Sequence, residues 1–302
     1  MLKVEDVEKI GVIGCGTLGT TLAAAAAPKY RVVVKRRDIS QGLGEEGLQR
    51  ISQCFPSMVR RDTLKEEQIP TAISNISMTA DFEDLKDCQM IFDATPDILE
   101  LKTAGFTQLN KICPPDTVFL GTSACISTTL LAAGSGRPDR VMTAHFLTPV
   151  HIYTLVETVA GLQTGQETIE FVEAFLREGL AKTVARVKDT PGLIQDYFLF
   201  AYFNHAIKLL ESNTATVEDI DTVIKAGFGV RLGPFELMDH LGMGSQIEAN
   251  NAIYEQTLNR AFAPHPLLVK MVAAGYTGRA VGKGWYIWDK EGKKTGINEL
   301  IY

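Results

Sequence analysis

Short runs of apolar residues alternate with longer helical patterns through the first part of the chain. Five such runs have the length and the β-branched content of buried strands, namely KIGVI (9–13), YRVVVK (30–35), MIFDAT (90–95), TVFLGTS (117–123) and VMTAHF (141–146). Helix-forming segments such as TTLAAAAA (20–27) and ILELKTAGFTQLNKI (98–112) lie between them. This order predicts an α/β fold with a doubly wound, mostly parallel sheet that carries helices on both faces.

The pattern changes near residue 188. KDTPGLI (188–194) is rich in turn-forming residues, and the segments after it, IQDYFLFAYFNHAIKLLES (194–212) and TVEDIDTVIKAGF (216–228), have helical periodicity. Thr216 is placed to cap the second of these helices, with Asp219 as the acidic member of a capping-box variant. We therefore predict an α/β domain over residues 1–187 and an all-helical domain over residues 188–302.

A glycine-rich turn joins the first predicted strand to the helix after it. The turn reads Gly14-Cys15-Gly16-Thr17-Leu18-Gly19 and matches the dinucleotide-binding pattern GxGxxG. In that pattern the first glycine makes a tight bend, the second admits the pyrophosphate to the backbone, and the third lets the helix pack on the strand. Free N–H groups at the helix N-terminus then bind the pyrophosphate without a basic side chain. The order of strand, turn, helix and strand predicts a Rossmann-type site, with a plain tight turn as the alternative.

Basic residues end the second predicted strand, where an NAD site normally has a carboxylate for the adenosine ribose. Lys35, Arg36 and Arg37 occupy this place, and a guanidinium binds phosphate with a fork of N–H donors. The run therefore favours NADP(H) over NAD(H), with Arg36 at the ribose-reading position. A solvated basic turn is the alternative, and Asp38 would supply a ribose carboxylate if the strand ended later.

Composition and charge favour some functional classes of protein and argue against others. The 302 residues are 45% hydrophobic and 22% charged, with a net charge of −6, which is typical of a globular protein and argues against a nucleic-acid partner. No apolar run approaches the roughly 20 residues of a membrane span, and the acidic N-terminus differs from a signal peptide. Five scattered cysteines without a CxxC pair fit a reducing compartment and argue against a structural metal. We therefore expect a cytoplasmic protein without a membrane partner.

Candidate catalytic chemistry lies in TAHFLTPVHIYTLVE (143–157), where His145 is at the end of a predicted strand and Glu157 closes the segment. An imidazole can accept the proton of a substrate alcohol while hydride leaves the same carbon, if a carboxylate fixes its tautomer and stabilises its charge. The spacing alone does not establish contact, because a histidine and a glutamate at this separation are more often unrelated.

Five segments resemble the L-3-hydroxyacyl-CoA dehydrogenases, a family that also includes 3-hydroxybutyryl-CoA dehydrogenases and relatives acting on other hydroxy acids. These segments are GVIGCGTLGTTLA, RPDRVMTAHFLTPVHIYTLVE, KDTPGLI, GPFELMDHLGM and GKGWYIWD, and the resemblance extends from about residue 9 to residue 288. It implies a Rossmann-type N-terminal domain, a helical C-terminal domain that forms a homodimer, and a substrate cleft between the two.

The resemblance also assigns roles to individual residues. His145 matches the general base, and Glu157 matches the carboxylate that orients it. Asp97 and Lys102 match an acidic residue and a lysine that are expected near the cofactor. His151 matches no catalytic position, and we expect it at the surface or at an interface.

Three polar positions around the substrate depart from the family pattern. In the loop 121–125, against which the nicotinamide would lie with Thr122 and Ser123 as contacts, Ala124 stands where the family has a serine that contacts the substrate oxygen. Ser123 could supply that donor only if the loop were shifted, because neighbouring residues of an extended segment point in opposite directions. Thr148 and Asp196 replace two asparagines, and a carboxylate at position 196 would repel an anionic substrate or receive a cationic or hydroxyl-bearing one. Ser123 and Asp196 thus join the candidate catalytic residues.

We therefore expect an NADP(H)-dependent oxidoreductase that interconverts a 3-hydroxyacyl thioester, carried by CoA or acyl carrier protein, or a related β-hydroxy acid, with its 3-oxo form. Use of NADP(H) would favour reduction as the physiological direction. Two alternatives stay open: the same fold acting with NAD on a small free hydroxy acid or hydroxy-amine, and a dinucleotide-binding protein that has lost turnover. Losing one hydrogen-bond donor to a developing charge commonly costs about a hundred- to a thousand-fold in rate, so the altered contacts do not exclude catalysis.

Overall fold

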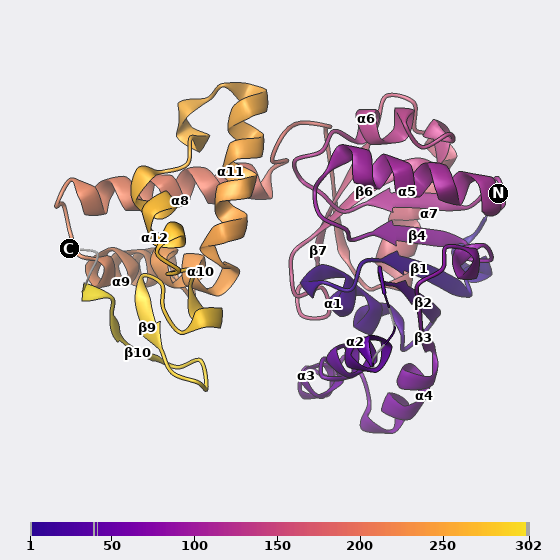
Figure 1. Cartoon of the computed structure of the whole chain (residues 1–302), viewed down its shortest axis with the longest axis horizontal. Coiled ribbons are helices and arrows are strands. Elements are labelled where there is room, and N and C mark those ends of the chain that lie inside the picture. The colour runs from indigo at the N-terminus through magenta and orange to yellow at the C-terminus, as the bar shows by residue number, and fades with distance from the viewer. Residues whose placement is uncertain (1, 39, 41, 300–302) are drawn as a thin grey trace. The chain divides into compact units, whose positions relative to one another are not determined.

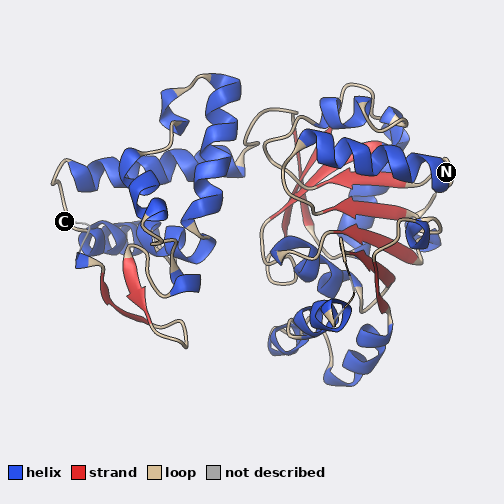
Figure 2. Cartoon of the chain, viewed as in Figure 1, coloured by secondary structure: helices blue, strands red, loops and turns tan. Residues whose placement is uncertain are grey.

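The computed structural model describes residues 2–38, 40 and 42–299, and its chain separates into two compact units between Thr190 and Pro191 (Figure 1). The first unit alternates strands with helices, and the second is mainly helical (Figure 2). None of the helices in the described part of the chain has both the length and the apolar character that a membrane span needs.

The first unit contains the sheet and the helices that cover it. Its strands are β1 (Lys9–Ile13), β2 (Arg31–Lys35), β3 (Ile76–Thr79), β4 (Met90–Asp93), β5 (Val118–Gly121), β6 (Val141–Phe146), β7 (Leu155–Ala160) and β8 (Thr183–Val187). Its α-helices are α1 (Thr17–Ala26), α2 (Leu43–Ser52), α3 (Phe55–Arg60), α4 (Ile69–Ser74), α5 (Leu99–Ile112), α6 (Thr128–Ala133) and α7 (Gln166–Ala174).

The strands form one sheet in the order β3-β2-β1-β4-β5-β6-β7-β8. All neighbouring pairs are parallel except β6 and β7, so the predicted mostly parallel, doubly wound sheet is confirmed. Strand β1 lies between β2 and β4, and the chain leaves β1 toward β2 but leaves β4 toward β5, so the ends of β1 and β4 flank the switch point of the sheet. Ligands of such sheets bind beside this switch point, at the carboxyl ends of the strands. The glycine turn starts there.

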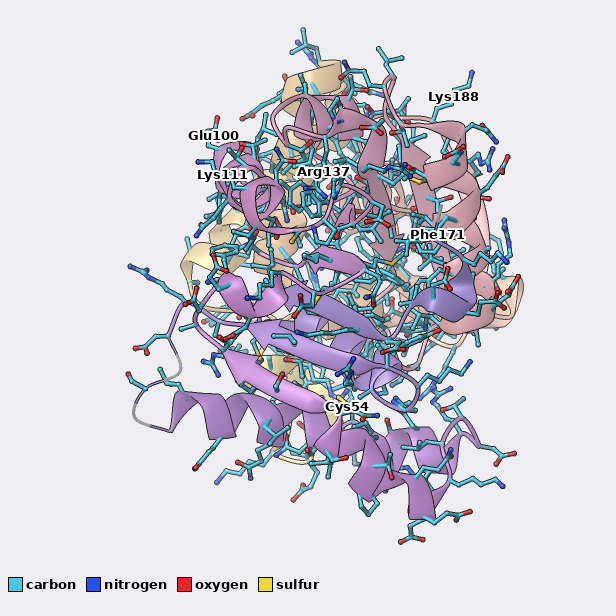
Figure 3. The ribbon with its side chains drawn as sticks, turned by 90° about the vertical axis from the view of Figure 1, so that its right-hand side faces the viewer. Cys54, Glu100, Lys111, Arg137, Phe171 and Lys188 are labelled. Carbon is cyan, nitrogen blue, oxygen red and sulfur yellow. The ribbon has the colours of Figure 1, made fainter. Side chains whose placement is uncertain are left out.

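Alternating side chains along the strands build a separate core on each face of the sheet. Val32 and Val34 of β2 pack in a cluster with α1 and α7, whereas Val33 packs in a cluster with α5 and α6. Figure 3 shows the two layers, with Glu100 of α5 on one side of the sheet and Phe171 of α7 on the other. The buried alanines of α1 let this helix lie close to the sheet, which fixes where its N-terminus points.

The second unit consists of α8 (Gln195–Glu211), α9 (Val217–Phe228), α10 (Pro234–Leu241), α11 (Met243–Thr257) and α12 (Pro266–Ala273), followed by an antiparallel pair, β9 (Tyr286–Trp288) and β10 (Lys294–Ile297). The helical character is confirmed, but the pair of strands was not predicted. Thr216 caps α9 as expected, because its side chain accepts the Asp219 N–H at 3.1 Å.

A buried carboxylate joins the strand pair to the helices. The side chain of Asp239, in α10, accepts the backbone N–H groups of Trp285 and Tyr286 and the indole N–H of Trp288, at 2.8–2.9 Å. A Cβ on Gly284 would lie 1.9 Å from the Asp239 carboxylate, so glycine is required at this approach. The segments GPFELMDHLGM and GKGWYIWD thus meet in the core of the second unit and serve its folding.

Candidate cofactor and active site

Two glycines of the turn after β1 have no room for a side chain. Gly14 has a φ of +101°, and a Cβ there would lie 2.6 Å from the carbonyl oxygen of Ala94. A Cβ on Gly19 would lie 2.1 Å from the carbonyl oxygen of Gly14. The first glycine therefore makes the bend beside β4, and the third lets α1 cross directly over the turn.

Gly16, the middle glycine, has a different environment. It caps the N-terminus of α1 in an extended conformation and is exposed, and no described atom lies within 4 Å of where its Cβ would be. The next residues, Thr17 and Leu18, begin the helix, whose first N–H groups have no partner within the helix. Open space beside these donors and the positive end of the helix dipole suits the pyrophosphate of a dinucleotide. The Thr20 hydroxyl donates to the carbonyl oxygen of Cys15 at 3.3 Å, and this bond ties the turn to α1.

The basic run at the end of β2 divides between the two faces of the sheet. Arg36 follows β2 on the face of α1, and its Nη1 donates to the carbonyl oxygen of Leu43 at 2.5 Å, at the start of α2. Nη1 also lies 3.1 Å from the position that a Cβ of Gly47 would take, and the Cys15 Sγ lies 3.4 Å from the same position. Arg36 is therefore beside the glycine turn, as the prediction of a ribose-reading residue requires.

Lys35 lies on the other face. It is buried, its Nζ is 4.2 Å from the centre of the Phe82 ring, and burial lowers its pKa. The Lys35 ammonium reaches the backbone carbonyl oxygen of Arg36 at 3.4 Å, but it lies on the opposite face of the sheet from the Arg36 guanidinium, since consecutive residues at a strand end point in opposite directions. Arg37 is exposed, and the carboxylate of Asp38 accepts the backbone N–H and the hydroxyl of Ser40 at 2.8 and 3.0 Å.

A buried lysine joins the ends of β4 and β5. Lys102 is fully buried, and its Nζ donates to the carbonyl oxygen of Thr95 at 2.9 Å and lies 3.5 Å from the Asp93 carboxylate and 3.7 Å from that of Asp97. The Ser123 hydroxyl, from the loop after β5, donates to the other oxygen of Asp97 at 2.7 Å. Asp97, Lys102 and Ser123 thus form one network at the edge of the sheet where the glycine turn lies.

Two hydroxyl side chains of the loop 121–125 bond to the backbone and hold the loop in place. Thr122 directs its hydroxyl to the carbonyl oxygen of Asp93 at 2.8 Å, and Ser123 Oγ accepts the N–H groups of Cys125 and Ile126 at 3.0 and 3.1 Å. Ala124 is buried and has no polar group to offer. The Ser123 hydroxyl donates to the Asp97 carboxylate.

The histidine and the glutamate lie directly opposite each other on neighbouring strands. His145 in β6 pairs with Glu157 in β7 in the antiparallel register, and the His145 Nδ1 is 3.0 Å from the Glu157 Oε2. The Glu157 side chain is 3% exposed and the His145 side chain 12%, so the carboxylate is buried behind an imidazole that still reaches the surface. The pair lies at the carboxyl end of β6, on the same edge as the ends of β1, β4 and β5.

Family models match both units of the chain. Residues 9–190 match the 3-hydroxyacyl-CoA dehydrogenase NAD binding domain, and residues 192–288 match the 3-hydroxyacyl-CoA dehydrogenase C-terminal domain. The chain belongs to the 3-hydroxyacyl-CoA dehydrogenase family. It is accordingly an oxidoreductase that acts on a CH–OH group with a nicotinamide cofactor.

Individual relatives resemble the chain over nearly its whole length. A probable 3-hydroxybutyryl-CoA dehydrogenase from Bacillus subtilis is 30% identical over 95% of this chain and 99% of its own length. A 3-hydroxybutyryl-CoA dehydrogenase from Bradyrhizobium diazoefficiens is 32% identical over 93% of this chain and 95% of its own. The crystal structure of FadB2 from M. tuberculosis has a TM-score of 0.89 at 29% identity, with 94% of this chain and 99% of that chain covered.

Two of the departures from the family pattern lie outside the network of β4 and β5. Thr148 lies in the segment between β6 and β7, three residues after His145, and is partly buried. Asp196 lies in the first turn of α8, in the second unit, and is also partly buried. His151 is half-buried, and its Nε2 lies 2.9 Å from the Ser57 hydroxyl of α3.

One anchoring residue was not predicted. Asp189, at the end of the first unit, accepts the hydroxyl groups of Ser127 and Thr129 and the backbone N–H groups of Thr128 and Thr129, at 2.8–2.9 Å. Its carboxylate therefore caps α6 and holds the loop that carries Ser123. The three consecutive hydroxyl residues at the start of α6 indicate a helix start in the sequence, but nothing local to them identifies a partner 60 residues away.

Proposed function

We propose that this protein is an NADP(H)-dependent dehydrogenase that interconverts a 3-hydroxyacyl-CoA with its 3-oxo form. The observation that carries the proposal is the His145 and Glu157 pair, held at 3.0 Å across the β6–β7 ladder at the same edge of the sheet as the glycine turn. A general base oriented by a buried carboxylate beside a dinucleotide turn is what alcohol oxidation by hydride transfer requires.

His145 moves the proton in this mechanism. Because the Glu157 carboxylate accepts at Nδ1, the neutral imidazole keeps its proton there and presents the Nε2 lone pair to a substrate hydroxyl. In oxidation Nε2 takes the hydroxyl proton, and Glu157 stabilises the imidazolium that results. A bound nicotinamide supplies the acceptor for the hydride that leaves the same carbon. In reduction His145 returns the proton to the developing alkoxide, so each direction transfers one proton and one hydride.

The geometry at the end of β2 supports NADP(H) as the preferred cofactor. Arg36 is held beside the glycine turn by its bond to Leu43, on the face where the adenosine ribose of a dinucleotide would bind. We propose that Arg36 binds the 2′-phosphate, with Arg37 as an outer contact and without Lys35, whose ammonium lies over the Phe82 ring on the other face of the sheet. Titration of the purified protein with NADPH and with NADH, followed by nucleotide fluorescence, tests the preference directly, and a lower Kd for NADH would contradict it.

The names of the relatives favour a CoA thioester of short chain length over other carriers. Acyl carrier protein remains a second carrier to be tested, with reduction of the 3-oxo compound as the physiological direction if NADPH is used. The buried Ala124 and the carboxylate of Asp196 favour a substrate that differs from that of the usual family member. We therefore also propose to assay small free β-hydroxy acids and hydroxy-amines.

Replacement of His145 by Ala tests the catalytic proposal. Loss of the general base should lower kcat by about 10²- to 10⁴-fold on every substrate that the wild type turns over, with nucleotide binding unchanged. The matched control is His205→Ala, which removes an exposed histidine of α8. If trace turnover of thioesters and free acids is the same before and after the His145 change, the protein binds dinucleotide without catalysis and the enzymatic proposal fails.

We propose that the second unit forms a homodimer. Large apolar side chains are exposed on it, including Phe198 at 73%, Phe228 at 74% and Leu258 at 76%, and apolar surface of this kind commonly marks an interface. Light scattering coupled to size-exclusion chromatography measures the mass directly. A monomer at micromolar concentration would exclude a stable dimer.

A further inference from the structure

The segment between the catalytic strands is held by contacts from outside the β6–β7 ladder. Residues 147–154 form turns rather than a helix or strand, and they connect His145 to Glu157. The ladder ends with the pair Phe146 and Val156, only one pair beyond His145 and Glu157. Since the ends of a ladder open most easily, the position of the catalytic pair depends on what holds this segment.

Lys182 is one of the residues that hold this segment, together with Thr21 and Ser57. It lies just before β8, its residue is 9% exposed, and its Nζ donates to the carbonyl oxygens of Val150 at 2.5 Å and Tyr153 at 2.8 Å. Burial lowers the pKa of this ammonium to about 8. Both of these acceptors are neutral carbonyls, and an apolar side chain would fill the same space without desolvating a charge.

Val150 connects this restraint to the cofactor helix. Its side chain is fully buried, and its N–H donates to the Thr21 hydroxyl at 3.1 Å. That hydroxyl in turn donates to the carbonyl oxygen of Thr17 at 2.8 Å, in the first turn of α1 after the glycine turn. Val150 is thus held through its carbonyl by Lys182 and through its N–H by α1, so the segment is fixed relative to both Glu157 and the pyrophosphate end of α1.

We propose that Lys182 is a positioning residue for proton transfer, whose two bonds to the segment 147–154 keep His145 and Glu157 in register with each other and with α1. This inference rests on the proposed roles of His145 and Glu157. Lys182 does not contact substrate or cofactor in this proposal. Its effect is on the fraction of molecules in which the imidazole is aligned, and therefore on kcat rather than on binding.

The test compares Lys182→Met, which keeps the length of the side chain without its donors, with Lys182→Arg, which keeps donors and charge. The matched control is Lys188→Met, an exposed lysine directly after β8, where Figure 3 shows the side chain pointing outward. Each variant is assayed as the full-length protein with 3-hydroxybutyryl-CoA, with and without deuterium at the carbon that loses hydride. Nucleotide Kd and circular dichroism are recorded in parallel.

Lys182→Met should lower kcat about 10- to 100-fold, since a misplacement of about 1 Å costs rates of this order. Its nucleotide Kd should stay within about threefold of the wild type, and its isotope effect on kcat should rise as hydride and proton transfer become limiting. Lys182→Arg should recover most of kcat, and Lys188→Met should match the wild type.

The proposal is overturned if Lys182→Met keeps kcat within about twofold, if its activity falls only in proportion to folded protein, or if Lys182→Arg recovers nothing. Should Lys182→Met not fold, Thr21→Val provides the second measurement, because it removes the other restraint on Val150 and should also lower kcat with a raised isotope effect. A His145→Ala variant run beside these separates the two hypotheses. If it remains active, the proposed function fails, whereas an inactive His145→Ala with a fully active Lys182→Met rejects only the positioning role.

Discussion

Replacing Arg36 by Ala should change cofactor selectivity rather than cofactor binding in general. The guanidinium is fixed at the start of α2 by the bond to the Leu43 carbonyl, and its Nη1 sits over Gly47, where any larger residue would crowd it. A ligand phosphate on the 2′ position would meet a donor group that is already ordered, so little side-chain entropy remains to be lost on binding. NADH carries a hydroxyl there and gains much less from the positive charge.

Hydrogen bonds to charged groups contribute about 1.5–3 kcal/mol, which corresponds to roughly a 10- to 150-fold change in Kd. Arg36→Ala should therefore weaken NADPH by about that factor and NADH by less than about threefold. The difference should shrink at high salt, because Arg36 is only partly buried and the interaction is screened. Fluorescence titration of both nucleotides at low and high ionic strength measures all four constants.

Arg31→Ala is the matched control for this experiment, since Arg31 is exposed at the opposite end of β2 and pairs with Glu8 at 3.2 Å. Lys35→Met is a second control, because the Lys35 side chain packs against Phe82 on the other face of the sheet. Both should leave the ratio of the two Kd values unchanged. An equal loss of NADPH and NADH affinity in Arg36→Ala would show that Arg36 only supports the turn. A changed ratio of the two Kd values in Lys35→Met would refute the statement that Lys35 takes no part in binding the 2′-phosphate.

Three other predictions concern the turn, the catalytic pair and the buried lysine. Gly16→Ala should fold with nearly unchanged stability but bind nucleotide much more weakly, because its Cβ would occupy the open space proposed for the pyrophosphate. Gly19→Ala should instead unfold at a lower temperature, because its Cβ would clash with the Gly14 carbonyl oxygen. Thermal melts and nucleotide titrations distinguish the two variants. Glu157→Gln should lower kcat about 100-fold with little change in KM, and an unchanged kcat would remove Glu157 from the mechanism. Since burial lowers the pKa of Lys182 to about 8, the folded state binds fewer protons than the unfolded state between that pH and the ordinary lysine pKa near 10.4. The free energy of unfolding of the wild type should therefore rise by up to ~3 kcal/mol relative to Lys182→Met as the pH is raised through this window, as denaturant titrations at several pH values would show.

The helices and strands that can be predicted from the sequence are those whose own residues show an apolar run or a helical periodicity. Strands β1, β2 and β4–β6 are continuous apolar runs, and helices α5, α8 and α9 have clear helical periodicity. Strand β3 reads ISMT with an exposed serine, and β8 is partly exposed along its length, so neither forms such a run. Edge strands take their structure from pairing with a neighbour, and that pairing is not a local property.

The same distinction applies to the site. The three glycines are identified by a pattern within six residues, because each role depends on the backbone beside it. The contact between His145 and Glu157 depends on the antiparallel register of β6 and β7, which the spacing between them does not determine. The separation of the Lys35 ammonium from the Arg36 guanidinium, by contrast, follows from strand alternation, which the sequence alone allows one to predict. The anchors Asp189 and Lys182 act on segments far along the chain, so no local pattern reveals them.

Two of the three changed residues, Ala124 and Thr148, lie in loops that anchoring residues hold, and this bears on what these two changes mean. Ala124 lies in a loop that Asp189 and Ser123 hold in place, and Thr148 lies in the segment that Lys182 holds. Because side chains bond to the backbone of these loops or to the helix start beside them, a substitution at position 124 or 148 alters the polar groups that a substrate meets without moving the loop. Burying the Lys182 ammonium opposite neutral carbonyls lowers the stability of the folded protein. A protein that only binds dinucleotide would gain nothing from this loss of stability, because it would not need an aligned His145. If His145 and Glu157 have the proposed roles, their retained contact together with the altered polar groups favours turnover of a different substrate over loss of activity.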